Sequence, residues 1–403
     1  MSAPLCLIQL VSEQTMQNVL PALALRPARL VLLHTPRTAP QCQWIAAALR
    51  RAGGAFELRT VRLTEMPDIA ETGAAVRTAI QSARDAGEDP LVNITGGTKL
   101  MSIGAFAATL APRCPSFYVD TEHRRFLDAG QVPAHSALAD PWELLQRAEQ
   151  TLNVDVVCAA HGIEHVSAGR DPAPFLPLAE HLRNHPADEL ACHSALSRLN
   201  FRFHQALDVI ARLDEPLPAL PPAVARLAGT AGLLESRGAV LYFSTPHRAA
   251  LERWTCGEAW NDKAEFYAAL QPLQFAQAFL SGGWWEVCVA HAARQSGRFR
   301  DLRWSAEVGL PGDRIEEDLL AVDGFNLAVF SCKRGGKGDR LNRAFEEFVA
   351  ASRRLGGTFS SKFFCVAQPI SSQYFSMVQT EAARDRVRLI GPHARLSPAL
   401  FAQ

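Results

Sequence analysis

The sequence has no excess of charge of either sign, because 41 lysine and arginine residues are balanced by 41 aspartate and glutamate residues. A balanced total removes any global electrostatic attraction to nucleic acid or to an anionic membrane, so a polyanion has to be met by a local basic patch. The chain also lacks a basic leader followed by an apolar core, and no stretch approaches the roughly 18 consecutive apolar residues of a transmembrane helix. We expect a soluble, cytoplasmic protein with no membrane partner.

Paired cysteines are lacking too. Nine cysteines are scattered along the chain with no CxxC motif, which predicts reduced thiols in a reducing compartment and argues against zinc fingers. Internal repeats and low-complexity tracts are absent. A length of 403 residues exceeds what one hydrophobic core usually serves, so two or three domains are expected.

Short apolar runs alternate with longer amphipathic segments from residue 5 to about residue 125. The runs are LCLIQLVS, RLVLLHTP, FELRTVRL, PLVNITGG and SFYVDT. This rhythm predicts a parallel sheet with helices on both faces, an α/β arrangement of Rossmann-like type. Ligands of such sheets bind beyond the carboxyl ends of the strands, which directs attention to the loops Ser12–Asn18, His34–Thr38 and Thr95–Lys99.

The rest of the chain divides into two further parts. Residues 151–262 are less regular and include a proline-rich stretch at 216–222. This pattern predicts a small connector that is helical or winged-helix-like. From residue 263 the pattern predicts one long helix over Glu265–Gln295, three strands, a charged helix over Arg340–Leu355 and another strand, SKFFCVAQP. We predict three domains, at residues 1–150, 151–262 and 263–403.

The stretch NITGGTK, residues 93–99, follows a predicted strand and opens a predicted helix. The backbone amides of such a loop and the helix N-terminus can receive phosphate oxygens, and Lys99 adds a positive charge. The stretch is not a P-loop, because Thr98 precedes the lysine, and it is not GxGxxG. Taken alone, it reads equally well as a plain turn that needs glycine for its backbone angles.

In this context NITGGTKLMSIGAFA resembles the strand, glycine loop and helix of the CARF family, the CRISPR-associated Rossmann-fold sensors of cyclic oligoadenylates. VSEQTMQNVLPAL is similar to the first ligand loop of that family, and FYVDTEHRR to the segment that follows. The resemblance implies that a ring of adenylates, with cyclic tetra-adenylate as the expected ring, binds across the two-fold axis of a homodimer. The ligand-binding residues that it implies are Gln14, Thr15, Asn18, Thr95, Gly96, Gly97, Thr98 and Lys99.

A second stretch with unusual charges is RIEEDLLAVDGFNLAVFSCKRGG, residues 314–336, which predicts a β-hairpin. With Asp323-Gly324 as the turn, Glu316 would face Ser331. Alternation would then put Glu316, Asp318, Ser331 and Lys333 on one side of the sheet. Two carboxylates and an ammonium group form a candidate metal and phosphate site, although an ordinary ion pair at a frayed strand end fits the same residues.

Glu286 lies in an apolar helical stretch, FLSGGWWEVCVAHAA, where a charge is costly unless it is paired or coordinated. A glutamate on a helix, then an aspartate, then an acid two residues before a lysine is the pattern of PD-(D/E)xK nucleases, and this region resembles that restriction-endonuclease-like fold. A CARF domain followed by GGWWE, EEDLL and CK resembles the cyclic-oligoadenylate-activated CRISPR ancillary nucleases. The resemblance implies a divalent cation, Mg²⁺ or Mn²⁺, held by Asp318 and Glu286, with Lys333 beside the scissile phosphate.

One position departs from the nuclease pattern, because Ser331 stands two residues before the lysine, where an acid is expected. A hydroxyl is a poorer Mg²⁺ ligand than a carboxylate. In the predicted register Glu316 faces Ser331 and would replace the missing acid as a metal ligand. We therefore include Glu316 among the expected catalytic residues. Glu346 or Glu347 on the next helix is a second candidate.

The region around Lys333 is locally basic, with five lysine and arginine residues against one acid between residues 331 and 343. Such a run is often only a solvated face, but its closeness to the candidate metal site favours a groove that follows a phosphate backbone. The expected nucleic-acid contacts are Arg334, Lys337 and Arg340.

We therefore predict a homodimeric, ring-activated, metal-dependent endonuclease of type III CRISPR defence that cleaves DNA or RNA with little sequence specificity. Two other functions remain compatible with the sequence. One is a ligand-responsive nucleic-acid-binding regulator with an inert nuclease remnant, and the other is a ring nuclease that degrades the cyclic ligand.

Overall fold

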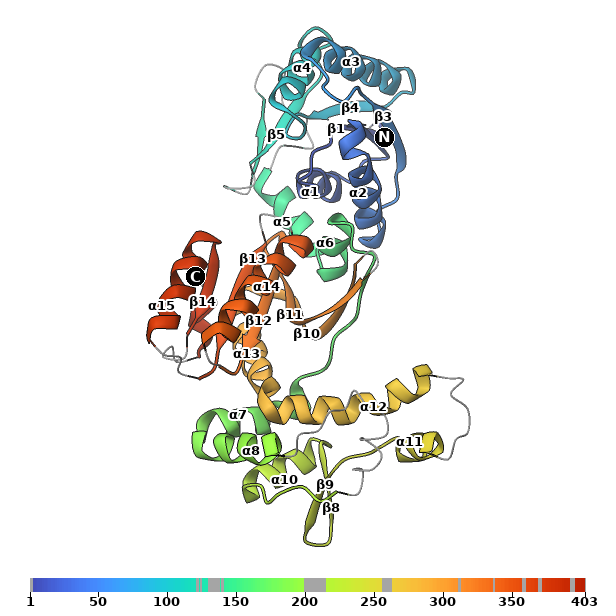
Figure 1. Ribbon diagram of the computed structural model, residues 1–403. Helices are drawn as coiled ribbons and strands as arrows, with labels where there is room; N and C mark the ends of the chain where they lie inside the picture. The colour runs from blue at the N-terminus through green and yellow to red at the C-terminus, as the bar shows by residue number, and fades with distance from the viewer. Residues whose placement is uncertain are drawn as a thin grey trace.

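The structure is a computed structural model that describes residues 3–120, 123, 125–129, 138, 141–198, 215–255, 263–310, 313–335, 338–356, 360–368, 372–391 and 396–402. Figure 1 shows three parts, with one sheet domain at the top, a second sheet domain in the middle and a mainly helical part at the bottom. Lys337 lies outside the described residues.

The N-terminal domain is built on a six-stranded sheet with the order β3-β2-β1-β4-β5-β6. Its strands are β1 (Leu5–Leu10), β2 (Arg29–His34), β3 (Glu57–Arg62), β4 (Asp89–Asn93), β5 (Ser116–Asp120) and β6 (Arg125–Asp128). The first five strands run parallel, and β6 pairs with β5 in the antiparallel direction. The predicted parallel α/β sheet is confirmed.

Helices cover both faces of this sheet, as the sequence pattern predicts. On one face lie α1 (Met16–Leu25) and α2 (Ala39–Arg51), and on the other lie α3 (Ile69–Asp85) and α4 (Lys99–Leu110). The central strands β1, β2 and β4 are therefore buried on both sides, which explains why they read as continuous apolar runs and not as alternating ones. The short turn η1 (Pro36–Thr38) joins β2 to α2.

The second sheet also has six strands, in the order β14-β13-β12-β11-β10-β7. They are β7 (His165–Val166), β10 (Phe299–Leu310), β11 (Asp313–Asp323), β12 (Asn326–Lys333), β13 (Ser361–Val366) and β14 (Val387–Ile390). Strand β7 follows α5 (Pro141–Thr151) and α6 (Val154–Ala160), so a segment assigned to the connector completes this sheet. The second α/β sheet domain is confirmed, and α15 (Ser372–Arg384) with β14 extends it beyond the predicted elements.

The two faces of the second sheet are covered by different helices. Helix α13 (Trp284–Gln295) packs on the face that carries Leu319 and Phe330, which we call the α13 face. Helices α6 and α14 (Gly338–Gly356) pack on the face that carries Leu320 and Val329, which we call the α14 face. This assignment of faces decides which charged residues of β11 and β12 can meet.

The long helix predicted before the sheet is in fact two helices. Helix α12 (Lys263–Ala278) is separated from α13 by η4 (Phe279–Gly283), one turn of π-helix. Gly282 has φ 159 within that turn, a conformation that favours glycine, and its α-carbon lies beside the side chain of Arg334. The kink starts a new helix just before Glu286.

The predicted turn of the β11–β12 hairpin is wrong by one residue, which displaces every pairing partner in β12 by two residues. Asp323 pairs with Asn326, so Gly324 and Phe325 form the turn and Asp323 ends β11. Gly324 supplies the positive φ that such a turn needs, whereas Asp323 is held in the ladder and binds Arg298 with a 2.7 Å ion pair. Glu316 consequently does not lie opposite Ser331.

The lower part of the molecule combines a small hairpin with several helices (Figure 1). Its elements are η3 (Ala173–Phe175), α7 (Leu176–Asn184), α8 (Pro186–Arg198), α10 (Pro222–Thr230), β8 (Leu234–Arg237), β9 (Val240–Phe243), α11 (Arg248–Thr255) and α12. A helix followed by an antiparallel hairpin is the arrangement expected of a winged-helix-like unit. The part shares its hydrophobic core with α13 and with the α13 face.

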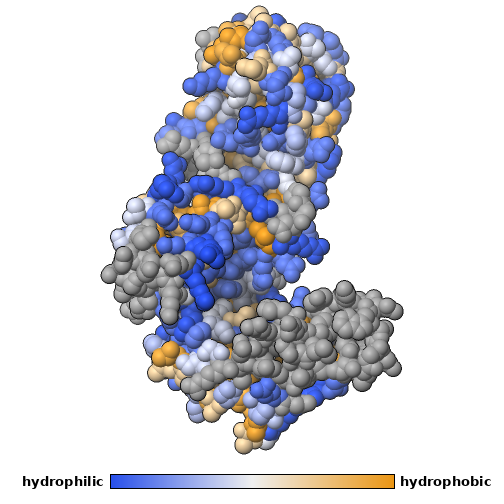
Figure 2. All heavy atoms as spheres, viewed as in Figure 1, coloured by the Kyte–Doolittle hydropathy of each residue, from blue (hydrophilic) through white to orange (hydrophobic). Residues whose placement is uncertain are grey.

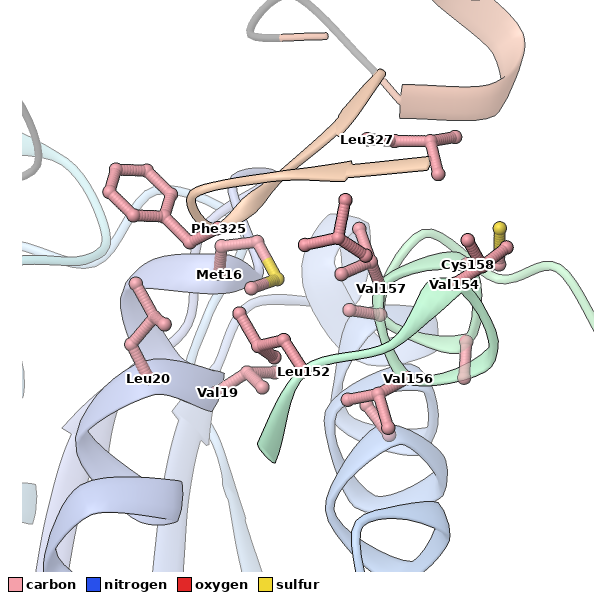
Figure 3. Close-up of a cluster of buried hydrophobic side chains, with 14 of the residues drawn as sticks. Met16, Val19, Leu20, Leu152, Val154, Val156, Val157, Cys158, Phe325 and Leu327 are labelled. Carbon is pink, nitrogen blue, oxygen red and sulfur yellow. The ribbon is translucent and has the colours of Figure 1, made fainter. Parts of the chain in front are cut away.

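The two sheet domains share one continuous core at their junction. Figure 3 shows Phe325, from the turn of the β11–β12 hairpin, next to Met16 and Leu20 of α1, with Val154 and Val157 of α6 nearby.

The turn η6 (Pro398–Leu400) lies near the C-terminus. In the part of the chain that the structure describes, no helix is both long enough and apolar enough to cross a membrane.

Candidate functional site

The N-terminal sheet reverses its strand order between β1 and β4. Strands β2 and β3 extend from one side of β1, and β4 and β5 extend from the other, so the loops that follow β1 and β4 diverge into helices on opposite faces. A crevice beyond the carboxyl ends of the strands is the usual ligand site at such a switch point. The loops Ser12–Asn18 and Thr95–Lys99 flank this point.

The glycine loop is pressed against the end of β1. A Cβ added at Gly96 would collide with the carbonyl oxygen of Leu10, and Gly97 has φ +76, so both positions require glycine. Thr98 begins α4 by accepting a hydrogen bond from the backbone N–H of Met101 at 3.3 Å. Lys99 is exposed at the first turn of this helix, and the loop thus offers backbone donors and a cation to an anionic ligand.

A buried polar network fixes the two loops relative to each other. Asn93 donates to Gln9 at 2.7 Å and accepts from the Thr95 hydroxyl at 2.6 Å. The same Thr95 hydroxyl oxygen accepts from the backbone N–H of Val119 at 2.7 Å. These groups form hydrogen bonds with one another inside the domain, and they therefore hold the glycine loop in place. The position of the sheet thus sets the direction of the backbone N–H groups of the loop.

The structure gives Thr15 and Asn18 a task that differs from the predicted ligand contacts. Both are buried, with exposed fractions of 1% and 0%. Asn18 donates to the carbonyl of Leu10 at 2.9 Å, and the Thr15 hydroxyl donates to the carbonyl of Ala160 in α6 at 2.5 Å. These side chains position the loop and tie it to α6, whereas Gln14 is exposed and remains a predicted ligand contact.

A cation that the sequence analysis did not single out lies at the same edge of the sheet. Arg37, in η1 beyond the carboxyl end of β2, forms an exposed ion pair with Glu13 at 2.5 Å. An exposed pair of this kind contributes little to stability and can be replaced by another anion. The sequence signal for Arg37 was the position of its loop, which follows a predicted strand at the carboxyl edge of the sheet.

In the second domain, Asp318 lies where β11 and β12 stop pairing. The ladder runs from Asp323 and Asn326 to Leu319 and Phe330. Beyond it, the Asp318 carboxylate accepts from the backbone N–H of Cys332 at 2.5 Å. Asp318 therefore takes the place of the next ladder bond, in the gap between the two strand ends.

Lys333 binds the same carboxylate oxygen, with its ammonium nitrogen 3.1 Å from Asp318. The Ser331 hydroxyl lies 3.5 Å from that oxygen. Burial alone would lower the pKa of Lys333, but the charge of Asp318 and the hydrogen bond to it raise the pKa above its usual value. The predicted closeness of Asp318, Ser331 and Lys333 is present in the structure.

Glu286 approaches this group from the first turn of α13. Its carboxylate accepts a 2.8 Å hydrogen bond from the indole N–H of Trp304. Burial, and then the negative charge of Asp318, raise the pKa of Glu286 to about 8, while Lys333 opposes the rise. A carboxyl group that is kept protonated near another acid is a feature of functional sites, because a bound cation can release the proton.

Glu316 and Glu317 lie on opposite faces of the sheet. The prediction that Glu316 shares a face with Ser331 and Lys333 is therefore wrong. Trp304 pairs with Leu319 on the α13 face, but Ala306 pairs with Glu317 on the α14 face. The alternation is interrupted in β10 at Ser305, which has φ 52. Glu316 is exposed, accepts from the Ser305 hydroxyl and pairs with Glu307 of β10, so it does not stand beside Ser331.

The sequence analysis overlooked Glu317, a buried acid next to Asp318. Its exposed fraction is 7%, and burial followed by the charge of Asp318 raises its pKa to about 8. Within the described residues, no three histidine, cysteine, aspartate or glutamate side chains already converge as a metal-binding group. The nearby acids nevertheless fit a divalent cation by their chemistry, because their mutual repulsion needs a positive charge.

The predicted nucleic-acid contacts differ in their environments. Arg334 is mostly buried, with its side chain 17% exposed and paired with the buried Glu189 of α8, so it links the end of β12 to the lower part. Gln368 donates to the same carboxylate at 2.6 Å. Arg340 is exposed at the start of α14 and remains a predicted phosphate contact. Lys337 is outside the described residues.

Residues 6–135 match the family model of the Card1 CARF domain. Can2 from Sulfobacillus thermosulfidooxidans, whose structure was solved in complex with cyclic tetra-adenylate, is 18% identical with a TM-score of 0.67, over 99% of this chain and 97% of that chain. Protein VC1899 from Vibrio cholerae is 14% identical with a TM-score of 0.68, over 98% of this chain and 96% of that chain. The comparison with curated proteins gave no match.

These comparisons confirm the fold class and the family resemblance. Residues 6–135, which form the N-terminal sheet domain, match the CARF domain model, and the fold of this chain matches both solved structures along nearly their whole length. At these identities the likeness establishes the fold, and the activity has to be argued from the site.

Proposed function

We propose that the chain is a nuclease that is activated by a cyclic oligoadenylate in type III CRISPR defence. The observation that supports this most strongly is the group formed by Asp318 and Lys333 at the open end of β11 and β12, with Glu286 approaching from α13. An acid and an amine fixed on one oxygen, in a sheet domain that follows a CARF domain, suit phosphodiester hydrolysis.

The proposed activator is cyclic tetra-adenylate, because the Can2 structure that shares this fold was solved with that ring. The groups that would bind it are the exposed Gln14 and the loop from Thr95 to Lys99. Backbone N–H groups at the start of α4 and the Lys99 ammonium suit its phosphates. Thr15 and Asn18 would act indirectly by holding the loop that carries Gln14.

The proposed assembly is a homodimer across the outer face of α4. Figure 2 shows apolar surface at the upper end of the molecule over this helix, and Leu100 and Ile103 are 50% and 52% exposed there. Large apolar side chains that are exposed on one helix face usually mark an interface. A second copy suits this face, because two copies of the glycine loop would then offer equivalent contacts to a symmetric ring.

At the nuclease centre, the chain's own residues would bind a divalent cation and orient the phosphate. A bound Mg²⁺ or Mn²⁺ supplies a water of lowered pKa and polarises the phosphoryl oxygens. Asp318 and Glu286 would hold the ion, and Lys333 would neutralise charge on the phosphoryl group. The exposed Arg340 would bind the backbone of the substrate without reading bases, which implies low sequence specificity.

Incubation with cyclic tetra-adenylate and Mn²⁺ or Mg²⁺ tests this function, with plasmid DNA, single-stranded DNA, RNA and the ring itself followed separately. We expect ring-dependent cleavage of a nucleic acid that is lost in Lys333→Ala. Intact nucleic acid that is retained on the protein would support an inert regulator instead. Loss of the ring alone would support a ring nuclease.

A further inference from the structure

The acid that the nuclease pattern requires beside Lys333 is absent from β12, where Ser331 occupies its position. Ser331 is buried, with an exposed fraction of 6%, and its hydroxyl lies 3.5 Å from Asp318. A site formed only by Asp318 and this serine would give a divalent cation one carboxylate on that side. Mg²⁺ is usually bound through one or two carboxylates of the protein, and the nuclease pattern expects a second one at this position.

Glu317 lies on the same side of the sheet as Ser331 and Lys333. In β12, Leu327 and Val329 point to the α14 face, and alternation places Ser331 and Lys333 on that face as well. In β11, Glu317 shares the α14 face with its partner Ala306. The interruption of the alternation next to Asp318 is what brings Glu317, and not Glu316, to this side.

Glu317 is also a buried acid with no partner. Its exposed fraction is 7%. Across the residues that the structure describes, its carboxyl makes no hydrogen bond and no ion pair, although Asp318 and Lys333 lie close enough to act on it through their charges. An unpaired carboxyl group is costly at such a position, and pairing with a cation would relieve that cost.

Glu286 and Glu316 do not lie on the α14 face, where the second carboxylate beside Lys333 is needed. Glu316 is exposed and bound to Ser305, and Glu286 extends from α13 on the opposite face. Asp318, in the gap between the strand ends, is within reach of both faces. On the α14 face beside Lys333, Glu317 is a buried acid, whereas Glu346 and Glu347 of α14 are exposed. We therefore take Glu317 as the second acid on this side, in addition to Glu286 from α13.

We propose that Glu317 replaces the missing acid of β12 and, together with Asp318, binds the divalent cation beside Lys333. The inference rests on the proposed nuclease function, and it moves the second carboxylate of the site from β12 to β11. It assigns Ser331 the lesser task of contacting Asp318. The nuclease centre would then be complete although its sequence departs from the pattern.

Titration of the full-length protein with Mn²⁺ alone, with the free ion measured by electron paramagnetic resonance, tests this without an activity assay. We expect Glu317→Gln to weaken Mn²⁺ binding at least about tenfold. Glu307→Gln, an exposed acid on the neighbouring strand β10, is the matched control and should bind as the wild type does. Thermal unfolding of each variant in EDTA checks that the fold is intact, and Glu317→Gln should unfold at the wild-type temperature or above it.

A relocation variant makes the assignment specific. Glu317→Gln combined with Ser331→Glu returns the acid to β12 and should restore Mn²⁺ binding to within about threefold of the wild type. The inference is overturned if Glu317→Gln binds Mn²⁺ as tightly as the wild type while Asp318→Asn or Glu316→Gln loses binding; the proposed function would survive that result. If the wild type itself has no saturable Mn²⁺ site, the inference and the metal-dependent nuclease both fail.

Discussion

At the scale of single residues, the proposed nuclease centre includes two buried glutamates whose pKa values the fold raises. Glu286 and Glu317 have pKa values of about 8, because burial and the charge of Asp318 disfavour their ionised forms. An unfolded glutamate ionises near 4.3. The folded protein therefore binds more protons than the unfolded chain between these two values.

This difference predicts how stability depends on pH in the absence of metal. The stabilising contribution is complete below the unfolded pKa and is lost as the pH rises through the folded pKa, so the free energy of unfolding should fall between about pH 5 and pH 8. We expect Glu317→Gln to remove part of this slope, on the order of 1–3 kcal/mol across the range. Thermal unfolding in EDTA at several pH values measures it, and an unchanged slope in the variant would contradict the assignment.

At the scale of elements, the glycine loop depends on a close approach between the ends of β1 and β4. Any side chain at Gly96 meets the carbonyl oxygen of Leu10, so the two loops would have to separate. The separation would disturb the backbone donors at the start of α4. Ring binding and stability should thus be lost together.

Gly96→Ala is the direct test of this close approach. We expect a loss of about 2–4 kcal/mol in the free energy of unfolding and at least a tenfold loss of affinity for cyclic tetra-adenylate. Gly87→Ala is the control, since Gly87 also has positive φ, at +73, but no atom lies within 4 Å of the added carbon. That variant should cost only about 1 kcal/mol and leave ring affinity unchanged. Equal effects of the two substitutions would argue against the close approach.

The elements also show what the sequence could and could not predict. Periodicity and turn residues predicted the parallel strands and the helices of the first domain, and a helix does begin at Lys99, at the end of the glycine loop. The hairpin was assigned correctly, but its register was not, because Asp-Gly and Gly-Phe both fit a two-residue turn and only the pairing of Asp323 decides between them. The interruption at Ser305, which exchanges the faces of Glu316 and Glu317, has no local sequence signal.

At the scale of the whole molecule, the loop after β1 and the β11–β12 hairpin both contact α6. Thr15 donates to the carbonyl of Ala160, and α1 and α6 share a core with the hairpin turn at Phe325 (Figure 3). A ring that binds one arrangement of the first loop more tightly would bias this contact. The contact thus connects the proposed ring loop to the turn of the hairpin that carries Asp318.

Thr15→Val tests whether that connection carries the signal. The variant loses the buried hydrogen bond and should be destabilised by about 1–3 kcal/mol. We expect its ring affinity to change less than about threefold while the ring-dependent increase in cleavage rate falls at least about fivefold. Thr78→Val removes an exposed hydroxyl contact, to Ala74 within α3, and serves as the control for the Thr-to-Val substitution itself. Full activation of Thr15→Val would exclude this connection.

The proposed homodimer is also a property of the whole molecule. Ile103→Glu places a charge on the exposed apolar face of α4 and should convert the dimer to a monomer in sedimentation velocity, with loss of ring binding. Leu190→Glu, at a 58% exposed leucine of α8, is the matched control and should remain dimeric. A dimer that persists in Ile103→Glu would place the interface elsewhere.

The central claim is that a ring bound in the first domain controls hydrolysis at Asp318 and Lys333 in the second. The most direct measurement is the rate of nucleic-acid cleavage in Mn²⁺, with and without cyclic tetra-adenylate, for the wild type and Asp318→Asn. The account predicts a rate that rises at least tenfold with the ring in the wild type and stays at background in the variant. Cleavage by Asp318→Asn at the wild-type rate, or a wild-type rate that ignores the ring, would contradict it.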